Sequence, residues 1–387
     1  MKPLLALLEG RTQPTTRTTR AAMTVLGGIG HLYGAVMGLR ATLYRRHLLS
    51  AYRAPCPVIS VGNLSAGGTG KTPMVLWLAQ QLAPWHRRLA IVSRGYGTPA
   101  TRTPGGPEGI TIVADPDGVR LAPPQAADEA VLLARRLPGV TVLTGADRSR
   151  LIRFAVAQYG AEIILMDDGF QHLRVQRDLD LVLMDARRPL GNGALLPGGI
   201  LRECPQALHR CHAIILTRCG SEGLFEEAKG LLTPLVPGKP LWRANHQPAD
   251  WMPLGETNPL PLSALTATPV LAFCGIARPD SFARLLEQTG TRTTGWEIFP
   301  DHFAFTQKRL DALVQTAHAQ QAQALVCTEK DAVKIDPDWL KGEGSPLPLL
   351  FLRMDLHFPT PPVWLYQRLT ALLGPPSSPD AAPHPPA

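Results

Sequence analysis

The feature that most constrains this chain is a glycine-rich loop set between an apolar strand and a helix. VISVG (residues 58–62) predicts a buried strand, and a helical stretch opens near Pro73, where the missing N–H has no intrahelical partner. A strand, a glycine-rich loop ending in Lys-Thr and a helix, in that order, are the setting of a Walker A loop. The residues of this loop are Ser65, Ala66, Gly67, Gly68, Thr69, Gly70, Lys71 and Thr72.

Such a loop predicts a site for phosphate groups. Its glycines let backbone N–H groups turn inward around phosphate oxygens, and the N-terminus of the following helix adds partial positive charge. Lys71 would reach the β- and γ-phosphates of a nucleotide, and the Thr72 hydroxyl would be a ligand of Mg²⁺. Ser65 stands at the first position of the motif, where glycine is usual.

Apolar strands alternate with helical stretches from Pro57 onward, which predicts βαβ units and a parallel sheet covered on both faces. The expected fold class is therefore α/β, with a mostly parallel P-loop NTPase-type sheet. The expected strands are residues 58–62, 89–93, 110–114, 162–168, 179–185 and 212–217, and the expected helices are 73–83, 127–137 and 147–159.

A proline-rich region, residues 233–269, precedes a second strand–helix series that predicts a smaller α/β domain. We expect four segments: an N-terminal basic and apolar membrane-associated helix, a P-loop domain, the smaller domain and a disordered proline-rich tail. Their expected ranges are 1–50, 51–236, 237–372 and 373–387. The second series places strands at 270–275, 296–299, 324–328 and 349–354, and helices near 280–289 and 306–320.

The net positive charge of the chain comes from its N-terminal quarter. The net charge is +8, and twelve Lys or Arg but no Asp or Glu lie between Gly10 and Pro107. This asymmetry predicts an anionic partner, either membrane headgroups or nucleic acid, unless it is simply a solvated basic face. The six cysteines form no CxxC pair, so we expect free thiols in a reducing compartment.

Residues 21–39 carry no formal charge and are flanked by arginines at both ends. The length is borderline for a membrane-spanning helix, so an interfacial helix on an anionic membrane fits better. A glycine-notched helix packed on its own domain explains the pattern equally well. On a helix, one face would carry Val25, Ile29, Leu32, Val36, Leu39 and Leu43, and the opposite side Gly30, Gly34 and Gly38.

Acidic residues occur at two informative places. Asp167 and Asp168 end the apolar segment EIILMDD, where a Walker B carboxylate is expected to bind Mg²⁺ directly or through water. Asp128 and Glu129 open an expected helix, and their position fits either a general base for a hydroxyl acceptor or favourable helix-start charge. His302 would orient such a base, although a single histidine among aromatic residues is more often structural.

Together the motifs resemble one family, the tetraacyldisaccharide 4'-kinases that phosphorylate lipid A precursors in Gram-negative bacteria. The similarity runs from about residue 20 to about residue 370. The motifs that carry it are, in order, VGNLSAGGTGKTP, SRGYG (93–97), the acidic pair 128–129, DDGFQH (167–172), GNGALLPGGILRE (191–203), FCGIARPDSF (273–282), FPDHFAFT (299–306) and TEKDAVK (328–334).

The resemblance implies a kinase that uses ATP and Mg²⁺ to phosphorylate the 4'-hydroxyl of tetraacyldisaccharide 1-phosphate, forming lipid IVA in lipid A (lipopolysaccharide) biosynthesis. It implies that Asp128 is the general base with His302 as its dyad partner, and that Lys71 contributes to catalysis. The implied metal ligands are Thr72, Asp167, Asp168 and Glu203. Candidate contacts to substrate or nucleotide are Arg94, Tyr96, Glu129, Arg148, Gln171 and Arg202.

The resemblance also implies where such an enzyme works. The basic N-terminal helix would dock on an anionic membrane surface, at the cytoplasmic face of the bacterial inner membrane, as a peripheral or monotopic protein. Its substrate partner would be an acylated glucosamine disaccharide 1-phosphate. A monomer is expected, with no nucleic-acid partner.

Two other functions fit parts of the pattern. A P-loop GTPase or metallochaperone would need an Asn-Lys-x-Asp segment after a late strand, but the strand at 212–217 is followed by Arg218-Cys219-Gly220. A nucleic-acid-binding ATPase would use the basic N-terminus, but that segment offers few aromatic residues for base stacking. Both alternatives are weaker than the kinase.

Overall fold

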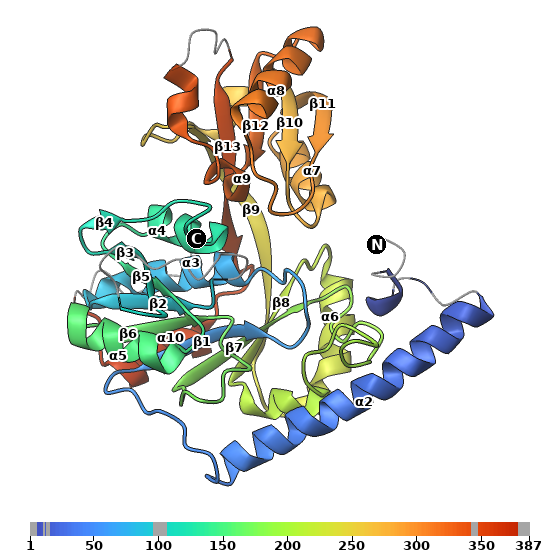
Figure 1. Ribbon diagram of the computed structural model, residues 1–387, viewed down its shortest axis with the longest axis vertical. Helices are drawn as coiled ribbons and strands as arrows, with labels where there is room; N and C mark the ends of the chain where they lie inside the picture. The colour runs from blue at the N-terminus through green and yellow to red at the C-terminus, as the bar shows by residue number, and fades with distance from the viewer. Residues whose placement is uncertain (1–5, 11, 13–15, 96–106, 342–346, 378–387) are drawn as a thin grey trace. The chain divides into compact units, whose positions relative to one another are not determined.

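The computed structural model describes residues 6–10, 12, 16–95, 107–341 and 347–377 (Figure 1). By internal packing the chain forms two compact units. The first, unit 1, comprises Met1–Arg94, Leu143–Asn245 and His357–Ala387; the second, unit 2, comprises Gly95–Val142 and His246–Leu356. The expected domains 51–236 and 237–372 are contiguous ranges, whereas the packed units are not.

Unit 1 contains the expected P-loop sheet, with the strand order β8-β7-β1-β6-β2. These five strands pair in parallel with their neighbours, and β9 extends the sheet beyond β8. Every residue of β1, β6 and β8 is buried, so helices and loops cover both faces. The strands are β1 (Val58–Asn63), β2 (Leu89–Ser93), β6 (Ile163–Asp167), β7 (Leu179–Asp185), β8 (Ala213–Thr217) and the start of β9 (Leu241–Pro253).

Helices of unit 1 connect these strands as the α/β pattern predicts. The helix α3 packs on β1 and β6, and α5 packs on β2. The sheet order reverses direction at β1, and ligands of such sheets bind outside the carboxyl ends of the strands at this reversal. The helices are α3 (Lys71–Leu82), α5 (Arg148–Tyr159), α6 (Glu222–Leu232) and α10 (Val363–Leu373), with β5 (Thr141–Thr144) following β2 in the sheet order.

The N-terminal segment forms one 29-residue helix, α2 (Arg17–Arg45), the long helix labelled in Figure 1. Gly30 and Gly34 are buried, and a Cβ on Gly34 would lie only 2.3 Å from a methyl group of Leu195. The glycines therefore let the helix pack closely on the loop around Leu195. The opposite face is exposed, from 49% at Ile29 to 69% at Leu32. The packed glycine side fits a helix that packs on its own domain, and the exposed apolar side fits an interfacial helix.

Unit 2 is built on a second sheet, with the order β11-β10-β12-β13-β9. The strands β10 to β13 are paired in parallel. Alternate residues of β10 enter two different cores: Leu271 and Phe273 lie in one, Val270 and Ala272 in the other. The elements are β10 (Pro269–Cys274), α7 (Pro279–Gln288), β11 (Arg292–Ile298), α8 (Gln307–Ala319), β12 (Ala324–Thr328), α9 (Glu329–Ala332) and β13 (Leu349–His357).

The segment Gly95–Val142 belongs to unit 2, although the rest of that unit, His246–Leu356, lies far away in the sequence. It contributes the hairpin β3 (Thr111–Asp115) and β4 (Gly118–Val119) and the helix α4 (Asp128–Arg136). The helix α4 packs against α9. Arg136 on α4 forms a buried ion pair with Glu329 on α9, with 3.0 Å between Nη1 and Oε2. Local sequence patterns cannot predict this pair, because its residues are 193 positions apart.

Two expectations need correction or restriction. The proline-rich region 233–269 does not merely separate domains, since it contains the 13-residue strand β9. Most of its prolines flank the strand, and only Pro248 lies in the strand interior. In the expected disordered tail, Trp85 Nε1 donates to the Gly374 carbonyl and Ser377 N to Pro84, while residues 378–387 lie outside the described part.

Candidate active site

The phosphate-binding loop follows β1 in unit 1, as the sequence predicts. Gly70 begins α3 with φ +89°, a left-handed conformation that glycine adopts without strain. Asn63, fully buried at the end of β1, donates through Nδ2 to the Gly67 carbonyl at 3.3 Å and to Thr69 Oγ1 at 3.2 Å. Thr217 Oγ1 donates to the Thr69 carbonyl at 2.9 Å. Side chains from β1 and β8 thereby fix the loop before any ligand binds.

Asp168 is the centre of charge beside this loop. Arg202 Nη1 donates to its two carboxylate oxygens at 2.8 and 2.9 Å, and Lys71 Nζ lies 3.6 Å from Oδ1. Burial alone would raise the pKa of Asp168, but the positive charges of Lys71 and Arg202 outweigh burial and lower that pKa. Asp168 is thus a carboxylate at neutral pH. Asp167, the last residue of β6, pairs in register with Val61 and is largely buried.

Gln171 links several parts of the site in unit 1. Its Nε2 donates to the Asn63 carbonyl at 2.8 Å, and its Oε1 accepts from Arg202 Nη1 at 3.4 Å. Its backbone carbonyl accepts from Arg40 Nη1 of α2 at 3.3 Å. The DDGFQH segment is therefore tied both to the strand that carries the P-loop and to the N-terminal helix.

Two further predicted residues lie in unit 1 with defined partners. Arg148 is buried, and burial lowers its pKa although Asp168 and Asp167 act in the opposite direction. Its Nη1 donates to the Ala146 carbonyl at 3.1 Å. Within the described residues, Arg148 Nε has no hydrogen-bond partner, which suits a contact to an anionic ligand. Arg94 is described, whereas Tyr96 lies outside the described residues.

Glu203 already has a positively charged partner. It is buried, and its Oε1 accepts from Arg210 Nη2 at 2.9 Å. The Arg210 guanidinium in turn lies 4.6 Å from the centre of the Phe170 ring. Burial, followed by the Glu203 charge, raises the pKa of Tyr33 on α2. The metal role of Glu203 stays a prediction.

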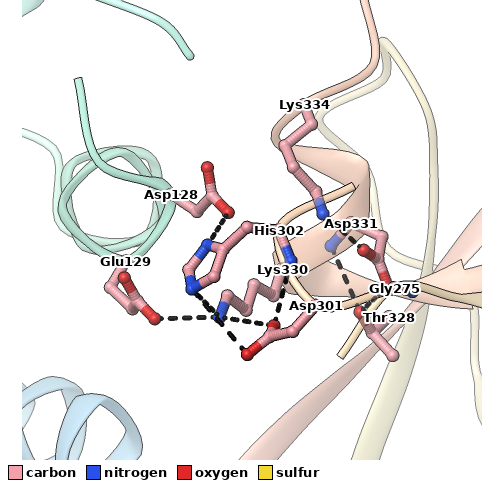
Figure 2. A network of polar contacts seen from close by, with 9 residues as sticks. All are labelled: Asp128, Glu129, Gly275, Asp301, His302, Thr328, Lys330, Asp331 and Lys334. Atoms are coloured by element: carbon pink, nitrogen blue, oxygen red, sulfur yellow. Dashed lines mark hydrogen bonds and ion pairs between the residues drawn. The ribbon is translucent and has the colours of Figure 1, made fainter. Parts of the chain in front are cut away.

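Unit 2 holds the predicted acid–histidine pair. Asp128 Oδ2 and His302 Nδ1 are 2.9 Å apart, although 174 residues separate them in the chain (Figure 2). Asp128 is the first residue of α4, and the N-cap is Ala127, which makes no side-chain capping bond. The carboxylate thus bonds a histidine and does not cap its own helix. Stacked and edge-on rings of Phe299, Phe303 and Phe305 surround the segment that carries His302.

Known proteins resemble this chain along most of its length. A family model described as Tetraacyldisaccharide-1-P 4'-kinase matches residues 22–372. This chain belongs to that family. Curated relatives named tetraacyldisaccharide 4'-kinase include one from Syntrophus aciditrophicus, 38% identical over 89% of this chain and 92% of the relative. Another, from Syntrophotalea carbinolica, is 43% identical over 85% of this chain and 87% of the relative.

A solved structure of the family has the same fold. It is described as the "apo" form of LpxK from Aquifex aeolicus in complex with ATP. The TM-score is 0.73 at 27% sequence identity, and the match covers 91% of this chain and 99% of the other. The α/β fold predicted from the sequence is thereby confirmed, and the chain is a kinase of the lipid A pathway by family.

Three groups of this site have no counterpart in the prediction made from the sequence. Asn63 holds the P-loop, and its signal was a polar residue ending an apolar strand. Arg40 reaches Gln171 from α2, but its sequence context marked it only as a membrane-facing arginine. Asp301 and Lys330 flank His302, and in the sequence they stood out only as parts of the FPDHFAFT and TEKDAVK motifs of the family resemblance.

Proposed function

We propose that this chain transfers the γ-phosphate of ATP to the 4'-hydroxyl of a tetraacylated glucosamine disaccharide 1-phosphate, giving lipid IVA. The observation that carries the proposal is the charged arrangement at the P-loop, where Lys71 and Arg202 converge on Asp168, in a chain that belongs to this kinase family over residues 22–372. An ATP complex of the Aquifex aeolicus relative supports the choice of nucleotide.

The P-loop would hold the nucleotide phosphates. Backbone N–H groups of residues 65–72 would surround the phosphate oxygens, and Lys71 would exchange its contact with Asp168 for the β- and γ-phosphates. The Lys71 ammonium lies 3.6 Å from that carboxylate, so its positive charge is already beside the loop. A charge placed there in advance favours transfer, because less reorganisation is needed during the reaction.

The donor atoms beside the loop fit Mg²⁺. Magnesium keeps several waters and needs only one or two protein carboxylates when nucleotide phosphates complete its coordination. Among the described residues no three His, Cys, Asp or Glu side chains gather into a group that could hold a metal ion. Thr72, Asp167 and Asp168 are the proposed ligands, with Glu203 as a further one after exchange of Arg210. Bound there, the ion would offset the charge of the β- and γ-phosphates.

Asp128 would serve as the general base. As the acceptor oxygen bonds to the γ-phosphorus and the bond to the β-phosphate oxygen breaks, the hydroxyl proton passes to the Asp128 carboxylate. Oδ2 accepts from His302, so Oδ1 is the oxygen proposed to take the proton. The side chain of Asp128 is only 12% exposed, and His302 holds it in one orientation. Correct alignment of a base commonly contributes ~10²–10⁴-fold to the rate.

Further polar side chains are proposed to bind substrate or nucleotide phosphates. The arginines among them carry a guanidinium suited to bidentate phosphate contact. Arg148 and Arg202 lie near Asp168, where an added anion would offset their charge. The proposed set is Arg94, Tyr96, Glu129, Arg148, Gln171 and Arg202.

The helix α2 is proposed to dock on an anionic membrane that carries the acylated substrate. Among the described helices it is long and apolar enough to cross a membrane by length and composition, and it is largely exposed. Its exposed stripe and the basic residues around it suit an interfacial helix better than a spanning one. The proposed location is the cytoplasmic face of the inner membrane, as a peripheral or monotopic monomer.

The proposal is tested by incubating the purified chain with γ-labelled ATP and an acylated glucosamine disaccharide 1-phosphate in mixed micelles. Label should move to the lipid, and excess unlabelled ATP should suppress the transfer far more than excess GTP. Lys71→Ala is the control for the site. Equal competition by GTP, or transfer that survives in Lys71→Ala, would contradict the proposal.

A further inference from the structure

The TEKD segment has no role in the reaction described so far. Its lysine, Lys330 on α9, has a side chain only 21% exposed and lies among polar groups from three parts of unit 2 (Figure 2). Its ammonium is 3.0 Å from Glu129 Oε1, 3.3 Å from Asp301 Oδ1 and 3.4 Å from His302 Nε2. Lys330 therefore contacts Glu129, which follows Asp128 in the chain, and Asp301, which precedes His302, as well as the His302 imidazole.

Hydrogen bonds to the next residue hold the backbone that carries Lys330 in place. Asp331, the next residue, is fully buried and accepts from the Gly275 N–H at 3.0 Å and from Thr328 Oγ1 at 2.6 Å. Lys334 Nζ donates to its other oxygen at 2.7 Å. These bonds join α9 to the ends of β10 and β12, as Figure 2 shows for the labelled side chains. An anchored lysine holds its partners in fixed geometry, unlike a typical surface ion pair.

Carboxylates keep Lys330 charged despite its burial. Burial alone would lower the pKa of Lys330, but the charges of Glu129 and Asp301 outweigh it and raise that pKa. A charged ammonium is a hydrogen-bond donor and has no lone pair to offer. The nitrogen of His302 that faces it must therefore be an acceptor, and the imidazole proton must lie on Nδ1, directed to Asp128 Oδ2.

We propose that Lys330 is a positioning residue that holds the His302 imidazole in its Nδ1–H tautomer, so that this N–H stays directed at Asp128 Oδ2. This rests on the proposed role of Asp128 as the base. In this tautomer the imidazole donates one hydrogen bond to Asp128, which fixes the orientation of the carboxylate.

The charged groups around His302 show which tautomer would compete with the Nδ1–H form. Asp128 and Glu129 face it from α4, and Asp301 Oδ2 lies 3.8 Å from Nε2. Lys330 supplies the positive charge in this group and contacts both Nε2 of His302 and the Asp301 carboxylate. Without Lys330, the tautomer that carries its N–H on Nε2, directed at Asp301, would compete with the Nδ1–H form.

The kinetic test compares Lys330→Met with Lys330→Arg. We expect Lys330→Met to lower kcat about tenfold or more with little change in the KM for ATP, and Lys330→Arg to retain most of the activity. In a His302→Asn background Lys330→Met should lower kcat much less, because Lys330 acts through the imidazole. Lys308→Met, which removes an exposed charge from α8, is the matched control. A loss of kcat that is equally large in the His302→Asn background would overturn the proposal.

A second readout does not depend on turnover. The ¹⁵N shifts of the His302 ring, assigned by comparison with His302→Asn, report which nitrogen carries the proton. The intact chain should show the Nδ1–H form, and Lys330→Met should show a larger share of the Nε2–H form. Unchanged ring shifts in Lys330→Met overturn the proposal even if activity falls. If instead the shifts move but Asp128→Asn keeps full activity, the tautomer assignment stands and the proposed base is wrong. If Lys330→Met lowers the thermal midpoint, Lys330→Gln takes its place in both experiments.

Discussion

Replacing Leu32 and Val36 with glutamine should weaken membrane binding without unfolding α2. These side chains are 69% and 57% exposed on the face opposite the packed glycines. Full burial of such a side chain contributes ~1.5–3 kcal/mol, so the unburied part of each is worth about 1 kcal/mol or more. The double variant should therefore lose about 2 kcal/mol of binding, or roughly 30-fold in partition. Glutamine keeps a helix propensity close to that of leucine.

The assay is flotation with liposomes that contain anionic lipid, over a range of salt concentrations. Leu231→Gln removes an exposed leucine from α6 of the same unit and is the matched control. Arg45→Glu with Arg46→Glu should reduce binding most at low salt, since each surface charge is worth ~1 kcal/mol at most and is screened. Equal loss of activity on membrane-embedded and detergent-dispersed acceptor would refute the docking role and make α2 part of the catalytic fold.

Three other perturbations test separate parts of the account. Lys71→Ala should lower turnover ~10²-fold or more at an unchanged thermal midpoint, and a retained rate would contradict its role. The double variant Asp128→Asn, His302→Asn should be little worse than its more damaging single variant, and fully multiplicative losses would contradict a shared role. Gly34→Val should destabilise by ~1–3 kcal/mol in urea unfolding, because α2 must move off its loop; an unchanged midpoint would contradict the packing. Burial, reinforced by nearby arginine charge, lowers the pKa of His172 to about 4. The unfolded chain binds this proton first as pH falls from 6.5, so the free energy of unfolding should drop in that range, and His172→Gln should flatten the drop by up to about 3 kcal/mol.

Local signals predicted the elements of the fold well, because each strand and its following helix are encoded within a few residues. The P-loop strand and helix were expected at 58–62 and 73–83, and the structure has Val58–Asn63 and Lys71–Leu82. The strand β9 was missed because flanking prolines masked it, and α10 lies behind two prolines at 361–362.

The division into units was beyond a local reading. Residues 95–142 join the C-terminal stretch through α4 and α9, and the buried Arg136–Glu329 pair joins residues 193 positions apart. The same limit applies to the site. The sequence offered His302 as a group that would orient a base at residues 128–129, but only the family resemblance chose Asp128 as that base, since no pattern within either segment indicates the other. Lys330 carried no signal of its own in the sequence, because a lysine beside acidic residues is usually a solvated surface group.

The most direct test of the central claim is the position of the new phosphate on the sugar. The product of the chain, ATP and an acylated glucosamine disaccharide 1-phosphate would be isolated, and proton–phosphorus correlation spectra would identify the esterified carbon. The account predicts a second phosphate on the 4'-oxygen of the distal glucosamine, with ADP formed in equal amount, and its loss in Asp128→Asn. A phosphate on another hydroxyl, or ATP hydrolysis without a phosphorylated lipid, would contradict it.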